Sequence, residues 1–154
     1  MTEEPDVLGA LIDHERAIKR LYETFATMLA DRQDFWQTLA RDEQRHADQL
    51  AGLRSEESVA GWLLRDSGVK VQSIRSSIAY VEGQIERAQG GGVSATLALT
   101  IAGDLEDALI EEQFSRIGTT GCAVLGTVLE RLVTETEQHR KTLIAALEIE
   151  RRSL

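Results

Sequence analysis

The chain has 154 residues, a formal charge of −9 at pH 7 and a single cysteine, Cys122. This length is sufficient for one domain with a hydrophobic core, so we expect a single domain over residues 1–154. The acidic balance argues against binding to nucleic acid or to an anionic membrane surface. One cysteine excludes an intramolecular disulfide and a cysteine-rich metal module. We see no signal segment and no apolar run that could span a bilayer, and we expect a cytoplasmic protein.

Long stretches rich in Ala, Leu, Glu and Arg, with Pro5 as the single proline, predict an all-α fold. The first helix is expected from about Asp6 to about Ala30. A turn over residues 31–34 follows, in which Asp34 is a candidate N-cap for the second helix. The second helix fades over residues 52–55. The short turn predicts that these two helices form an antiparallel hairpin.

A longer connection follows the second helix. It contains an apolar patch (Trp62, Leu63 and Leu64) and then a further helix with a narrow apolar stripe, formed by Val71, Ile74, Ile78, Val81 and Ile85. Three glycines, residues 90–92, end that helix. Ser94 is a candidate N-cap of the next helix, which should reach about Ile117, and the last helix should run from about Ala123 to Arg152. We therefore expect an up-down-up-down four-helix bundle with an extra helix in the long connection.

Acidic and histidine side chains interrupt the apolar faces of these four helices. Glu15 lies in the stripe of the first helix, and Glu43 and His46 form a Glu-x-x-His pair in the stripe of the second. Glu106 and His139 lie in the apolar faces of the last two helices. A buried carboxylate normally shifts its pKa or binds a cation. Because all five residues lie near the middle of their helices, we expect one internal cluster that binds metal.

The two halves of the chain look like a diverged repeat. Residues 39–46 align with residues 132–139, so that His46 corresponds to His139. One Glu from each of two helices, with Glu-x-x-His from each of the other two, is the di-metal pattern of ferritin-like bundles. Thr136 departs from this pattern because it stands where the second such Glu is expected. Its hydroxyl is expected to bond back to the Leu132 carbonyl, and Glu135 is a candidate substitute ligand.

The sequence resembles the rubrerythrin branch of the ferritin-like superfamily. The resemblance is carried by Glu15 with Tyr22 seven residues later, by the run Asp-Glu-Gln-Arg-His at 42–46, and by residues 99–106 and 135–139. It implies a ferritin-like fold with two iron ions per chain, or with manganese or zinc. The ligands that it implies are Glu15, Glu43, His46, Glu106 and His139, to which the four-residue step before His139 adds Glu135 as a substitute. Tyr22 would bond to a ligand or tune the site. The chain has no Cys-x-x-Cys, so it lacks a rubredoxin module and would need an external electron donor.

Two classes of function fit these residues. The first is redox chemistry, in which a di-iron site oxidises Fe(II) with peroxide or dioxygen and Glu43 bridges the two ions. The second is a degenerate bundle without redox activity, a binding or structural protein in which the same side chains form a buried hydrogen-bond network. A narrower alternative is a site for one metal ion formed by Glu15, Glu43 and His46 alone.

The apolar stripe of the connecting helix and the patch at residues 62–64 predict a homodimer. Not all of this surface can enter a core that four helices already fill, and exposed apolar patches usually mark an interface. Two-fold association is the commonest way to cover such a patch. The alternative is that the extra helix folds flat against its own bundle and hides the stripe.

Overall fold

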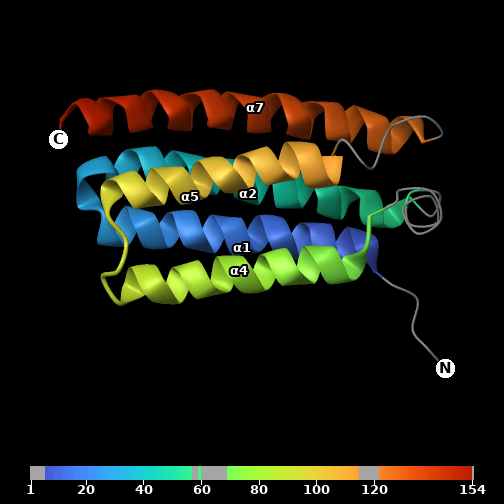
Figure 1. Cartoon of the computed structure of the whole chain (residues 1–154). Helices are drawn as coiled ribbons and strands as arrows, with labels where there is room; N and C mark the ends of the chain where they lie inside the picture. Colours follow the sequence, from blue (N-terminus) through green and yellow to red (C-terminus); the bar gives the residue numbers. More distant parts are fainter. Residues whose placement is uncertain (1–5, 57–58, 60–68, 115–121, 154) are drawn as a thin grey trace.

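The computed structural model describes residues 6–56, 59, 69–114 and 122–153, and over these residues the chain is helical and has no strand (Figure 1). Five α-helices lie side by side: α1 (Val7–Met28), α2 (Gln33–Ala51), α4 (Val71–Gln89), α5 (Ala95–Ala108) and α7 (Ala123–Arg152). Two 3-10 turns, Ala30–Arg32 and Gly52–Ser55, flank α2, and a π-helical turn, Leu109–Phe114, continues α5. The all-α class is confirmed. None of the described helices is long and apolar enough to cross a membrane.

Side chains at the helix ends explain several of these bounds. Asp6 caps α1 by accepting a 2.8 Å hydrogen bond from the Gly9 amide. Ser94 caps α5, as the sequence predicts, by accepting from the amide of Leu97 at 3.1 Å. The prediction that Asp34 caps α2 is wrong, because the 3-10 turn runs directly into α2 and places Asp34 inside its first turn.

Pairs of side chains fix the directions of the helices. Tyr22 bonds to Glu106 and His14 to Gln113, so α5 and its π-helical extension run antiparallel to α1. Arg75 pairs with Asp13 and Arg20 with Glu82, so α4 runs parallel to α1.

These directions overturn the expected helix order. Arg32 pairs with Glu150 and Arg45 with Glu135, so α2 and α7 are antiparallel. The helices α1, α2, α5 and α7 therefore run up, down, down and up, and the predicted up-down-up-down order is wrong. The physical reason is that α4 runs the length of the bundle and returns the chain to the end where α2 begins (Figure 1).

The apolar stripe of α4 lies against the rest of the chain. Ile74, Ile78 and Val81 are buried, and Val71 and Ile85 are partly buried against the core. The expectation that part of this stripe is exposed is therefore wrong for these five residues, and the alternative that α4 folds against its own bundle is confirmed. The patch at 62–64 lies outside the described residues.

An aromatic group occupies the core beside the acidic side chains. The Trp36 ring is fully buried and lies 4.8 Å from the ring of Phe25 and 5.5 Å from that of Tyr22, measured between centroids. The Tyr22 ring connects this aromatic group to the cluster described below, because its hydroxyl contacts Glu106.

Candidate metal centre

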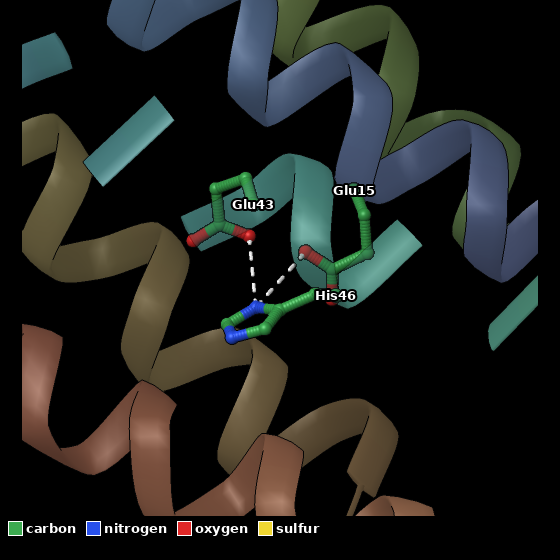
Figure 2. A group of neighbouring side chains, drawn as sticks. All are labelled: Glu15, Glu43 and His46. Carbon is green, nitrogen blue, oxygen red and sulfur yellow. Dashed lines mark ion pairs between the residues drawn. The ribbon is translucent and has the colours of Figure 1, made fainter. Parts of the chain in front are cut away.

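Three side chains from α1 and α2 converge inside the bundle. Glu15, Glu43 and His46 are each at most 1% exposed, and Figure 2 shows both carboxylates directed at the same edge of the imidazole. The Nδ1 atom of His46 lies 3.4 Å from Oε2 of Glu43 and 3.9 Å from Oε2 of Glu15. The helix spacing explains the meeting point, because Glu43 and His46 are three residues apart on α2 and share a face.

A second group adjoins the first and shares Glu43 with it. The Nδ1 atom of His139, on α7, lies 3.3 Å from Oε1 of Glu43 and 3.4 Å from Oε1 of Glu106, on α5. Glu43 therefore presents one oxygen to each histidine. The two imidazole rings are stacked with their centroids 5.6 Å apart. The structure thus brings together the five residues that interrupt the apolar stripes, one or two from each of four helices.

Tyr22 holds one of these carboxylates in place. Its hydroxyl donates a 2.7 Å hydrogen bond to Oε1 of Glu106, and both side chains are fully buried. Burial and the nearby charge of Glu106 raise the pKa of Tyr22 well above its ordinary value, so the phenol stays protonated and remains a donor.

In each histidine, the Nε2 atom points away from the cluster and contacts a carboxylate. The carboxylate that contacts His46 comes from α7, and the one that contacts His139 comes from α2. The Nε2 atom of His46 lies 2.5 Å from Oε2 of Glu135, and the Nε2 atom of His139 lies 2.9 Å from Oδ2 of Asp42. Both Nδ1 atoms therefore face the cluster. The expectation that Glu135 reaches inward as a substitute ligand is not met, because its carboxylate is 32% exposed and lies on the outer side of His46.

Arg45 connects these two outer carboxylates. Its guanidinium lies 2.9 Å from Asp42 and 3.0 Å from Glu135. The apolar stripes of the sequence do not mark Asp42 and Arg45 as part of the site. The repeat carried a signal for the acids, since Asp42 and Glu135 each stand four residues before the histidine of their own half. The repeat gives no such indication for Arg45, because the equivalent position in the second half is Gln138.

Thr136 lies at the position equivalent to Glu43. It is fully buried, and its hydroxyl has no hydrogen-bond partner among the described residues. The expectation that it bonds back to Leu132 is therefore wrong. Other helical threonines do bond to the carbonyl four residues earlier, namely Thr24, Thr27, Thr38, Thr100, Thr127 and Thr134.

The cluster contains an unusual number of buried polar atoms without a hydrogen-bond partner in the part of the chain that the structure describes. They are both carboxylate oxygens of Glu15, both of Glu43, one of Glu106, and the Nδ1 atoms of His46 and His139. Proteins leave few such groups, and each one requires an explanation. The residues form two groups of three, each with potential ligand atoms within 4.8 Å of one another. A metal ion in each group would satisfy these atoms, so the residues fit such ions.

Burial and neighbouring charges shift the pKa values of the side chains in the cluster. Burial and the charge of Glu43 raise the pKa of Glu15 well above its usual range, and the same two causes raise that of Glu106 to about 7. Burial alone would lower the pKa of His139, but Glu106 and Glu43 raise it to about 11. Burial alone would raise the pKa of Glu43, yet contact with Glu15, His139 and His46 holds it well below its ordinary value. A bound cation would replace these protons.

The third histidine lies apart from this cluster. His14 is 1% exposed, and its Nδ1 and Nε2 atoms lie 2.9 Å from Gln113 on the π-helical turn and 2.9 Å from Ser77 on α4. Burial lowers the pKa of His14 to about 4, so the ring is neutral. His14 joins three elements around the cluster and is not one of its members.

The fold and the site together define a helical protein with a buried acidic and histidine cluster that could hold metal ions. Comparisons with protein families, curated proteins and solved structures find no match for the chain.

Proposed function

We propose that this chain is a ferritin-like protein of the rubrerythrin type that binds two divalent metal ions, with iron as the cellular metal. The observation that carries the proposal is the position of Glu43, which lies between two groups of three potential ligands and presents one oxygen to each histidine. The ligands are carboxylates and imidazoles, a set that suits iron or manganese. The single long crossover between α2 and α5 also fits a ferritin-like fold.

In this proposal each half of the cluster holds one ion. Glu15 and His46 would hold the first, Glu106 and His139 the second, and Glu43 would bridge both. Iron at these positions would supply the electrons for reduction of peroxide or dioxygen.

The surrounding residues support these ligands. Asp42 and Glu135 accept the outer N–H of each imidazole, which keeps each Nδ1 lone pair directed inward. Tyr22 fixes Glu106, and the five ligand side chains are themselves at most 5% exposed. The electrons for a redox cycle would come from an external donor.

The second candidate is a degenerate bundle that has lost redox chemistry, and Thr136 is the observation that favours it. If the cluster were a structural hydrogen-bond network, its polar atoms would bond mainly to one another. Seven of the ligand atoms instead lack a well-formed hydrogen bond among the described residues, and the Nδ1 atoms lie 3.3–3.9 Å from the nearest carboxylate oxygens. For this reason we prefer the metal site.

Metal content tests the choice between these functions. We expect protein purified from iron-supplemented cells to carry two iron ions per chain, and Glu43→Ala to carry almost none because both ions lose a ligand. Glu130→Gln is the matched control, since Glu130 lies exposed on α7 and should keep full iron content. A wild-type protein that contains no iron and binds none on titration with Fe(II) would contradict the proposal.

A further inference from the structure

The second half of the cluster lacks one carboxylate, and Thr136 marks the position where it is missing. Thr136 stands three residues before His139 on α7, and the two residues share a helix face. Its side chain is fully buried and its hydroxyl is without a partner among the described residues, unlike six other helical threonines. A buried hydroxyl that donates no hydrogen bond is unfavourable, so we expect another group to accept one from it.

Charge gives an independent reason to expect a further ligand. Between them, the two groups contain three carboxylates, those of Glu15, Glu43 and Glu106. Their histidines bind metal as neutral imidazoles. Among the ligand side chains themselves, three negative charges leave one positive charge of two divalent ions unmatched, while Asp42 and Glu135 lie outside the histidines and share Arg45. A buried charge without a partner is strongly unfavourable, so a bound monoanion would stabilise the loaded site.

Size gives a third reason. A threonine side chain ends where the carboxylate group of a glutamate would begin, so Thr136 is shorter than the expected ligand by one carboxylate group. Formate consists of that carboxylate group alone.

We propose that the second metal position binds a small carboxylate monoanion from solution beside Thr136, in place of the missing glutamate carboxylate, with the Thr136 hydroxyl donating a hydrogen bond to it. This inference rests on the proposed two-metal function. It assigns Thr136 as a binding residue for an external ligand and makes occupancy of the second position dependent on that ligand.

Titration of metal-free protein with Co²⁺, with and without formate, tests the inference. The visible absorption of Co²⁺ and the heat of binding report each ion separately. In wild type we expect millimolar formate to tighten binding of the second ion by about tenfold, which corresponds to about 1.4 kcal/mol, and to leave the first ion unchanged. We also expect loaded protein to broaden the resonance of ¹³C-labelled formate.

Three variants sharpen the test. Thr136→Glu should bind both ions tightly without formate and show no formate effect. Thr136→Val keeps the size but removes the hydroxyl, so a weaker formate effect should remain. Ala145→Glu is the control, because Ala145 is exposed on the same helix at a distance from Thr136, and its variant should respond to formate as wild type does.

The outcomes separate this inference from the proposed function. If wild type binds two ions with the same affinities in the presence and absence of formate, the inference is wrong and the proposed function stands. An equal formate effect in Thr136→Glu would also overturn it. If no ion binds under any condition, both the proposed function and the inference are wrong. The wild-type titration and the ¹³C measurement decide the matter even if a variant does not fold.

Discussion

At the scale of single residues, the chemistry of the cluster depends on which groups carry protons. His139 holds a proton at neutral pH when no metal is present, because Glu106 and Glu43 raise the pKa of its imidazole to about 11. Burial and the charge of Glu43 raise the pKa of Glu15 well above its usual range. Glu43 is ionised under the same conditions. Metal binding must displace protons, so the apparent metal affinity should fall as the pH is lowered.

Arg45 provides a test of the outer layer. Arg45→Gln removes the bridge between Asp42 and Glu135, and the two histidines then lose part of their orientation. We expect metal affinity to fall by about 10-fold or more at both positions, as for other partners of metal-bound histidines. Competition with a chelator of known affinity measures the change. Arg41→Gln, at an exposed site on the same helix, should bind like wild type, and equal affinities for all three proteins would refute the role given to Arg45.

The five residues of the cluster could be predicted from the sequence because each one interrupts an apolar stripe. The outer layer could not, since Asp42 and Arg45 are partly exposed and have the pattern of ordinary surface charges. The sequence shows that Thr136 departs from the second Glu-x-x-His, and it predicts a bond from the hydroxyl to the backbone. Only the packed structure shows that this bond is absent among the described residues.

At the scale of helices, periodicity predicted the elements and missed their order. The bounds of α1, α4 and α7 agree closely with the sequence pattern. The reason is that glycines, capping residues and the limits of the apolar spacing mark the same positions in the sequence. The order failed because α4 was treated as part of a connection. Its 19 residues extend for about 28 Å at 1.5 Å per residue, which is enough to carry the chain along the whole bundle and reverse the direction of α5.

His14 links α1, α4 and the π-helical turn, and its titration gives a prediction about stability. Its pKa of about 4 is below the value of about 6.5 expected for an unfolded chain. The stability that neutral His14 confers is therefore present above about pH 6.5 and is lost as the pH falls through 4, a change of about 3 kcal/mol.

Urea unfolding of metal-free wild type and of His14→Asn, measured from pH 7 to pH 4, tests this prediction. The difference in unfolding free energy between the two proteins should shrink toward acid pH, because the asparagine does not titrate. Comparison with the variant cancels the other titrating groups. A difference that stays constant over this range would show that His14 is not held neutral by burial.

At the scale of the whole molecule, the burial of the α4 stripe removes one reason for a dimer. Ile74, Ile78 and Val81 already pack within their own chain. The homodimer stays a prediction that rests on Trp62, Leu63 and Leu64, which lie outside the described residues. Light scattering at micromolar concentration tests it, with a mass near two chains expected. Replacing Leu63 and Leu64 with Ser should then yield monomers, whereas a wild-type mass near one chain would reject the dimer.

The central claim is that two metal ions lie on either side of Glu43. Crystals grown from protein loaded with Fe(II) without oxygen, with diffraction data collected at the iron absorption edge, test it most directly. We predict two anomalous peaks per chain, one among Glu15, Glu43 and His46 and the other among Glu43, Glu106 and His139. A single peak in the first group would favour the site for one metal ion, and the absence of any peak in the cluster would contradict the metal-binding account.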